Sequence, residues 1–286
     1  MKISVVPKAI INTQLPKKDK IMQQLIMDLK ELKLIAMAAN LEEQRQVPLN
    51  QSLSFEERLS LLVHAEITAR RNRKINRLLR SSALKPGIMI EDVECDEKRG
   101  LKRSIFLSIM RMDFMQTHQN IVITGATGCG KTHLACAIGN KACIEGYKVK
   151  FVKLPIFLEE LHLSHVNGGF MKLLQQLMTV DLLILDDFGI TPINESQRHD
   201  LLTIIDERYK LKSTIFTSQL PVKAWHKYLG EPTLADAILD RVLSQSSRID
   251  LKGKSLRWKD GQTMDDMRQD IAEIISQQTS INQLVN

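Results

Sequence analysis

The chain has 286 residues and a formal net charge of +7, and 43% of its residues are hydrophobic. This length allows one good-sized domain plus a smaller one, with enough apolar residues for a core. No apolar run approaches the roughly 18 residues of a membrane span, and Met1 to Leu15 lacks the features of a signal peptide, so we expect a cytoplasmic protein with no membrane partner.

Two amphipathic helices are predicted near the N-terminus, behind a Lys- and Pro-containing lead-in of residues 1 to about 20. From Ile21 to Arg45, apolar residues recur at helical spacing, which predicts one helix that needs a partner surface. A second helix is predicted to start at Ser54, whose hydroxyl can cap the first turn while Glu57 reaches back in a capping box. It is predicted to run to about Arg80.

The last third of this second helix carries six positive charges with no acid between them. Five of them fall on one helical face and are called the basic stripe: Arg70, Arg73, Lys74, Arg77 and Arg80. We predict that the basic stripe follows the phosphates of double-stranded DNA, because like charges destabilise a helix unless a polyanion relieves them. No aromatic residue interleaves with the charges, which argues against base stacking on single strands. The alternative is a solvated basic face.

The helical pattern stops between Ser81 and Gly100, where Pro86, Gly87 and an acidic cluster indicate a domain boundary. After one more predicted helix, Leu101 to about Thr117, strand-like runs alternate with helical ones. Such alternation predicts an α/β fold in which helices cover both faces of a parallel sheet. The predicted strands are Ile121–Thr124, Lys148–Lys153, Asp181–Asp186, Ser213–Ser218 and Arg248–Leu251.

The first predicted strand leads into Gly-Ala-Thr-Gly-Cys-Gly-Lys-Thr, which is typical of a phosphate-binding loop. Its glycines allow a tight turn, so that several N–H groups and the start of the next helix point at one polyphosphate. Lys131 is predicted to neutralise the β- and γ-phosphates of ATP, and Thr132 to bind Mg²⁺. A Gly-rich turn that only opens a helix is the alternative. The predicted nucleotide contacts are Gly125, Ala126, Thr127, Gly128, Cys129, Gly130, Lys131, Thr132 and His133.

Polar residues at the ends of two later strands are predicted to complete the site. An apolar strand ends in Asp186 and Asp187, which places both acids at the carboxyl edge of the sheet beside the loop. Asp186 is predicted to hold Mg²⁺ and Asp187 to polarise the attacking water, although a buried strand followed by a turn gives the same pattern. Gln219 can sense the γ-phosphate, or serve only the turn that follows its strand.

Two further stretches have open alternatives. The last predicted helix opens at Thr233, with Asp236 completing a capping box, and carries Arg241. This arginine is either a surface ion-pair partner or a residue that reaches across a subunit boundary. Residues 156–179 predict two helices with histidines that either contact DNA or are simply exposed.

Together these segments resemble the IstB-type ATPases, AAA+ helper proteins encoded beside the transposase of bacterial insertion sequences and related to the DnaC-type helicase loaders. The resemblance spans about Leu32 to Arg257 and depends on motifs in a fixed order. It implies an AAA+ P-loop NTPase core with a five-stranded parallel sheet of order 5-1-4-3-2, preceded by a small helical domain. The motifs are Ser54–Leu59, Gly125–Ala135, Leu182–Gly189, Ser213–Pro221, Leu239–Arg241 and Leu251–Arg257.

The resemblance also implies residue roles and domain limits. Gln219 would be the sensor, and Arg241 the finger that completes the ATP site of a neighbouring subunit. Many AAA+ members have Glu where this chain has Asp187, and the shorter side chain implies slow intrinsic hydrolysis. The tail after Arg257 holds one helical pattern, around Met264 to Ile275, which is too little for the usual helical lid and leaves the role of Arg257 open. The implied domains are 1–85 (helical and basic), 86–257 (ATPase) and 258–286 (tail).

The implied function is ATP- and Mg²⁺-dependent binding of double-stranded DNA, largely independent of its sequence, by a multimer that delivers or stimulates the partner transposase. DNA or the partner would stimulate hydrolysis. A replicative helicase loader shares this core and is the first alternative, although it needs an N-terminal module that grips a helicase. A small-molecule kinase with the same phosphate loop is the second alternative. Gln219 and Arg241 suit a hydrolysing oligomer better than a kinase.

Overall fold

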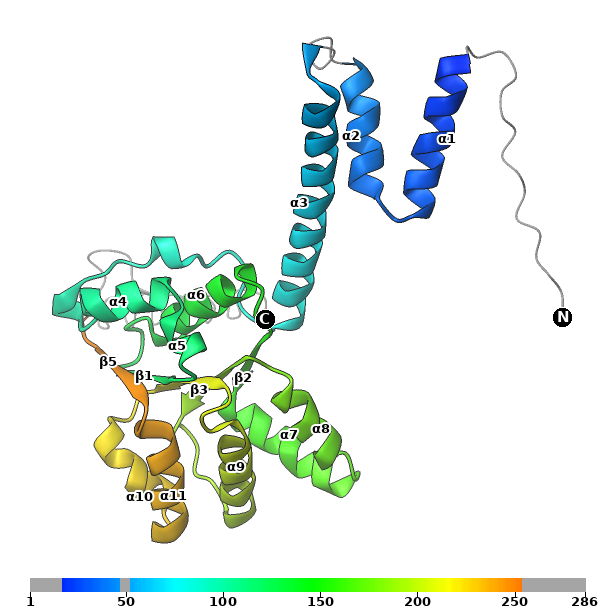
Figure 1. Ribbon diagram of the computed structural model, residues 1–286. Coiled ribbons are helices and arrows are strands. Elements are labelled where there is room, and N and C mark those ends of the chain that lie inside the picture. Colours follow the sequence, from blue (N-terminus) through cyan, green and yellow to red (C-terminus); the bar gives the residue numbers. More distant parts are fainter. Residues whose placement is uncertain (1–16, 47–51, 254–286) are drawn as a thin grey trace, which may run out of the picture. The chain divides into compact units, whose positions relative to one another are not determined.

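The computed structural model describes residues 17–46 and 52–253 (Figure 1). The chain divides into two compact units between Asn76 and Arg77, within one long helix. In the first unit, α1 (Lys17–Glu31), α2 (Ile35–Gln46) and the start of α3 (Phe55–Ser81) surround a small apolar core. The division lies before the predicted domain limit at residue 85. The core residues of this unit are Ile26, Leu29, Ala38, Leu41 and Leu62.

The prediction of one helix from Ile21 to Arg45 is wrong, because the chain turns between α1 and α2. Lys33 has a φ of 60°, a left-handed conformation that ends a helix. Its N–H donates to the carbonyl of Lys30 (3.0 Å), and the N–H of Leu34 donates to that of Leu29 (2.8 Å). This pair of bonds is a Schellman motif, normally formed by glycine, so the apolar periodicity on both sides conceals the break.

The predicted start of α3 is confirmed by its capping box. The N–H of Ser54 donates to the Glu57 carboxylate (2.8 Å), and the N–H of Glu57 donates to the Ser54 hydroxyl (3.2 Å). These bonds lower the pKa of Glu57. The predicted helix from Leu101 to Thr117 is instead two helices, α4 (Arg103–Met110) and α5 (Asp113–Gln116), because Met112 between them has a φ of 59°.

Five parallel strands form one sheet in the order β2-β3-β4-β1-β5, which confirms the predicted order. The residues of the three inner strands, β3, β4 and β1, are almost entirely buried, as expected for a parallel sheet covered on both faces. The predicted strands are all present, with ends shifted by a few residues at most. The observed strands are β1 (Asn120–Gly125), β2 (Val149–Lys153), β3 (Leu182–Phe188), β4 (Ser213–Ser218) and β5 (Ser246–Leu251).

Helices cover the two faces of the sheet, as Figure 1 shows. One face carries α4, α5 and α6 (Lys131–Ile144), with Ile121 and Ile123 of β1 pointing into that core. Val122 points into the opposite core. The helices of that second face are α7 (Leu154–Val166), α8 (Phe170–Met178), α9 (Glu195–Arg208), α10 (Trp225–Leu229) and α11 (Pro232–Leu243).

The segment between Ser81 and Gly100 belongs to the second unit and packs against its α6 and β2. It contains the short 3-10 helices η2 (Ile90–Asp92) and η3 (Glu97–Arg99), and Ser82 and Ile90 are buried. No helix among residues 17–46 and 52–253 is both long and apolar enough to cross a membrane. Arg257, the helical pattern near residues 264–275 and most of the predicted lead-in lie outside the described residues.

The predicted capping box of Thr233 and Asp236 is wrong. Pro232 is the first residue of α11, and the Glu231 carboxylate accepts the N–H groups of Thr233 (3.1 Å) and Leu234. These bonds lower the pKa of Glu231. A proline at the first helical position fixes the helix start, so the residue before it becomes the cap.

Candidate nucleotide-binding site

The predicted phosphate loop connects β1 to α6. Gly125 has a φ of 146°, and a Cβ there would lie 2.3 Å from the carbonyl oxygen of Leu251 on β5. Gly130 precedes α6 with a φ of 99°. Both positions therefore require glycine, one for close approach and one for a left-handed turn. The loop opens at the positive end of α6, where N–H groups bind anions.

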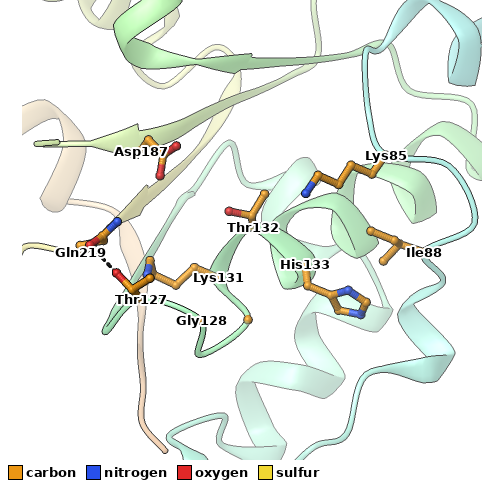
Figure 2. Close-up of a pocket in the computed structure, with 10 residues that line it drawn as sticks. Lys85, Ile88, Thr127, Gly128, Lys131, Thr132, His133, Asp187 and Gln219 are labelled. Carbon is orange, nitrogen blue, oxygen red and sulfur yellow. Dashed lines mark hydrogen bonds between the residues drawn. The ribbon is translucent and has the colours of Figure 1, made fainter. Parts of the chain in front are cut away.

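A cavity of about 400 Å³ lies against this loop (Figure 2). Gly125, Ala126 and Cys129 do not line it; Cys129 is buried and its carbonyl accepts a bond from Arg99 (3.3 Å). Asp187 and Gln219 reach the cavity from the ends of β3 and β4. The predicted contacts that do line it are Thr127, Gly128, Gly130, Lys131, Thr132 and His133.

Lys131 is held inside the loop and is only 7% exposed. Its ammonium donates to the carbonyls of Gly125 (2.9 Å) and Ala126 (2.8 Å). Carbonyl oxygens are weaker partners for an ammonium than phosphate oxygens, because the charge-assisted bond is the stronger one. A polyphosphate in the cavity can therefore replace them.

Three oxygen-bearing side chains meet beside the loop. The Thr132 hydroxyl donates to Asp186 (2.9 Å), which is 1% exposed, and the Thr217 hydroxyl donates to the same carboxylate (2.5 Å). Mg²⁺ prefers a few hard oxygen ligands beside substrate phosphates. Thr132 and Asp186 fit that ion, because both are oxygen ligands and they lie next to the phosphate loop.

Asp187 occupies a bulge at the end of β3. The register between β3 and β4 shifts between Leu185 and Phe188, and Asp187 has a φ of 64°. Its N–H donates to the Thr217 hydroxyl (3.2 Å), so Thr217 is bonded to both acids. Bulges re-aim side chains near functional sites, and here Asp187 lines the cavity while its neighbour Asp186 stays buried.

Gln219 lies directly over the phosphate loop. Its side-chain oxygen accepts a bond from the Thr127 hydroxyl (2.7 Å), as Figure 2 shows. The alternative that Gln219 serves only the turn after β4 does not explain this contact. A neutral amide at this position can detect what the loop binds.

Arg241 does not lie at the nucleotide cavity of its own chain. Its side chain contacts Asp206 and the carbonyl of Ala237 (3.0 Å). Its own carbonyl accepts a bond from Asn120 (3.3 Å), the first residue of β1, whereas the phosphate loop follows the last residue. The five steps along β1 separate the two places by about 17 Å, at about 3.3 Å per residue.

The basic stripe has a partner that sequence reasoning missed. Glu66, whose side chain is 6% exposed, accepts bonds from Arg70 (2.9 Å) and Arg73 (3.1 Å). It also accepts the N–H groups of Ala36 (2.9 Å) and Met37 (3.3 Å) at the start of α2. The bond from Arg70 is the main cause that lowers the pKa of Glu66.

The other stripe residues, Lys74, Arg77 and Arg80, are exposed and form no ion pair with any described residue. Within the basic stripe, these three residues are the ones whose charge no acid of the described chain compensates. The acid that partners the others lies four residues before Arg70, on the same helical face, and that spacing was the available signal.

The stretch 156–179 forms α7 and α8, as predicted. His165 pairs with Asp200 on α9 (2.8 Å) and stacks on Phe170, with ring centroids 4.1 Å apart. These contacts give this histidine a packing role between helices. His162 is exposed.

Two cavity residues were not predicted from the sequence: Lys85 and Ile88. Both belong to the segment after α3, and the Asn140 side chain of α6 donates to their carbonyls (3.2 Å and 2.8 Å). No local motif marks them. An adjoining cavity of about 230 Å³ shares Gly130 and His133 with the first.

Comparisons with known proteins agree with this geometry. The family described as IstB-like ATP binding protein matches residues 27–263. The chain belongs to this family. It is 45% identical over 208 residues to the insertion sequence ATP-binding protein y4pL of Sinorhizobium fredii, covering 73% of this chain and 85% of that protein.

More distant matches extend the same picture. The IS232 ATP-binding protein of Bacillus thuringiensis is 32% identical over 238 residues, covering 83% of this chain and 95% of that protein. Among solved structures, AMPPCP-bound DnaA from Aquifex aeolicus matches with a TM-score of 0.50 and 23% identity, covering 60% of this chain and 51% of that chain. That likeness concerns the fold, which is the predicted AAA+ α/β core.

Proposed function

We propose that this protein is an Mg²⁺-dependent ATPase that assembles on double-stranded DNA and recruits or stimulates the transposase of an insertion sequence. The observation that carries the ATPase part is the convergence of Lys131, Thr132, Asp187 and Gln219 on one cavity at the carboxyl edge of the sheet. The named relatives are ATP-binding proteins of insertion sequences, which supports the biological setting.

Each side chain has a separate task in this proposal. Lys131 leaves the carbonyls of its own loop and binds the β- and γ-phosphates, while Thr132 and Asp186 hold Mg²⁺. When bound, Mg²⁺ neutralises charge on the transferring phosphoryl group. Asp187 accepts a proton from the attacking water, and Gln219 contacts the γ-phosphate.

The nucleoside lies on the side of the cavity formed by Ile88 and His133, away from Asp187 and Gln219 in Figure 2. The adjoining cavity extends this side, with Val93 and Leu251 as apolar walls. Ribose and base need such a partly apolar surface, whereas the phosphates need the loop.

The position of Arg241 supports self-association. Because Arg241 lies at the edge of the sheet opposite its own loop, it can act on ATP only from a neighbouring copy. Its pairing with Asp206 would then be the resting arrangement of an unassembled subunit. An arginine finger supplied from a neighbour stabilises the charge of the transition state.

DNA binding is assigned to the exposed part of the basic stripe, Lys74, Arg77 and Arg80, with Arg70 and Arg73 partly neutralised by Glu66. A replicative helicase loader remains the alternative, because such loaders share the core. Pull-downs with the transposase of the same element and with the host replicative helicase distinguish the two functions.

Two substitutions test the ATPase part. Lys131→Ala should abolish ATP binding, whereas Asp187→Ala should retain binding but block hydrolysis, because one residue holds the phosphates and the other acts on water. Nucleotide affinity and turnover are measured separately, by calorimetry and phosphate release. Unchanged turnover in Asp187→Ala would show that the catalytic assignment is wrong.

A sizing experiment tests assembly on DNA. The wild-type protein should form large complexes with duplex DNA in ATP, and Lys131→Ala should not. Complexes that form equally without nucleotide would contradict the role of ATP.

A further inference from the structure

Lys85 enters the nucleotide cavity from the segment after α3, and the function proposed above gives its side chain no role. Figure 2 shows its side chain pointing toward Thr132, on the side of the cavity away from Gln219. Lys85 is exposed, and it forms no ion pair with any residue in the described part of the chain. Its ammonium therefore has three donors available for an incoming anion.

The backbone of this segment is fixed to the elements that carry the phosphate loop. Asn140, which is 5% exposed, donates to the carbonyls of Lys85 (3.2 Å) and Ile88 (2.8 Å). The N–H of Phe151 on β2 donates to the carbonyl of Ser82 (2.8 Å). Lys85 thus extends from a rigid support rather than from a free loop.

The segment that carries Lys85 also packs closely against α6. Leu84 lies so near Gly139 of α6 that a Cβ at this glycine would approach its side chain to 2.8 Å. The neighbouring Ala83 has a φ of 60°, which turns the chain from α3 toward α6. Gly139 therefore permits the contact that places Lys85 beside the cavity.

The reach of Lys85 matches the distance to the phosphate site. Its backbone N–H is bonded to the sulfur of Cys136, whose pKa burial raises, so that the thiol carries no competing charge. Cys136 lies four residues after Thr132 and thus about 6 Å further along the helix, at about 1.5 Å per residue. A four-carbon lysine stem covers one helical turn.

We propose that Lys85 is a further nucleotide-binding residue, whose ammonium binds the polyphosphate of a nucleoside triphosphate beside Thr132. Lys131 binds the phosphates from the loop, and Lys85 binds them from the segment that follows α3. The proposal rests on the proposed ATP binding and deepens it.

The test compares four full-length proteins by calorimetry with ATP and Mg²⁺: wild type, Lys85→Ala, Lys85→Arg and the matched surface control Lys227→Ala. A hydrogen bond to a charged group implies that Lys85→Ala weakens ATP binding about tenfold or more. Lys85→Arg should keep most of the affinity, and Lys227→Ala should match wild type. High salt should reduce the difference between Lys85→Ala and wild type.

Hydrogen exchange gives a second readout that does not depend on activity. ATP should protect the amides of residues 82–88 in wild type but not in Lys85→Ala. Equal ATP affinity and equal protection in wild type and Lys85→Ala would overturn the proposal. A wild-type protein that binds no ATP would contradict the proposed function itself.

Discussion

At the scale of single residues, Thr217 is bonded to both Asp186 and Asp187, the acids of the proposed ATPase site. The Thr217 side chain is fully buried; its hydroxyl donates to Asp186 and accepts the N–H of Asp187. Asp187 has a left-handed backbone conformation. Such a conformation costs about 1–3 kcal/mol and persists only where surrounding contacts hold it. Thr217 therefore positions the two acids and does not itself contact the nucleotide in the proposed site.

Thr217→Val should leave ATP affinity nearly unchanged and lower kcat about tenfold or more, because a loss of about 1.4 kcal/mol in positioning corresponds to a factor of ten. Thr217→Ser, which keeps the hydroxyl, should recover most of the rate. Steady-state kinetics separate kcat from KM. The control is Thr203→Val on α9, whose hydroxyl bonds only within its helix. An equal loss in the serine variant would favour a purely structural role for the β-branched side chain.

Residues also differ in how well the sequence predicts them. The phosphate loop and Asp186, Asp187 and Gln219 were predictable because each follows an apolar strand in a local pattern. Lys85 was not, since only its packing against α6 brings it to the cavity. Contacts between segments distant in sequence leave no local pattern.

At the scale of elements, Glu66 of α3 joins two helices. Its carboxylate caps the start of α2 and also pairs with arginines of its own helix. Glu66→Ala should destabilise the first unit by about 1 kcal/mol, the usual effect of a lost cap. The measurement is amide exchange across residues 35–46 in the full chain, because global unfolding of two units is not a single transition. Glu31→Ala, at an exposed position, is the control. Unchanged exchange in Glu66→Ala would show that the cap adds no stability.

The Glu66 carboxylate also makes the stability of the first unit depend on pH. Folding lowers the pKa of Glu66. The stability that this carboxylate contributes is therefore fully present above the usual glutamate pKa of about 4.3, and it is lost as the pH falls through the lowered pKa. Protection of residues 35–46 should therefore fall in acid more steeply in wild type than in Glu66→Gln.

The basic stripe divides into paired and unpaired charges, and this division is testable. Neutralising Lys74, Arg77 and Arg80 together should lower the slope of log affinity against log salt by up to about 2.7, from about 0.9 per phosphate contact. Neutralising Arg70 and Arg73 should lower it less per residue, because Glu66 already compensates them. A control triple of Lys210, Lys223 and Lys227 should leave the slope unchanged. An unaltered slope in the first variant would make the stripe a solvated face.

The elements themselves were largely predictable, and the two missed helix breaks have one physical origin. The strands, the start of α3 and the sheet order follow from apolar runs, capping residues and the resemblance to a known family. The breaks at Lys33 and Met112 escaped prediction because residues other than glycine adopt left-handed conformations there. Tertiary packing, rather than local preference, selects those conformations.

At the scale of the whole molecule, the phosphate loop and the proposed finger Arg241 lie at opposite ends of strand β1. The loop follows the end of β1, and Arg241 lies near its beginning. In the proposed function, a single chain therefore binds ATP without its finger, and hydrolysis would require a neighbour. That proposal predicts slow turnover of the isolated subunit and faster turnover of the assembly on DNA.

Mixing two inactive variants measures the shared site most directly. Arg241→Ala should bind ATP normally but lose hydrolysis, where a finger contributes about 10³- to 10⁵-fold, and Lys131→Ala should lose ATP binding. Together on DNA, some interfaces pair an intact loop with an intact finger, so ATPase activity should reappear. Continued inactivity of the mixture, with co-assembly shown by sizing, would contradict an ATP site completed by the neighbouring copy.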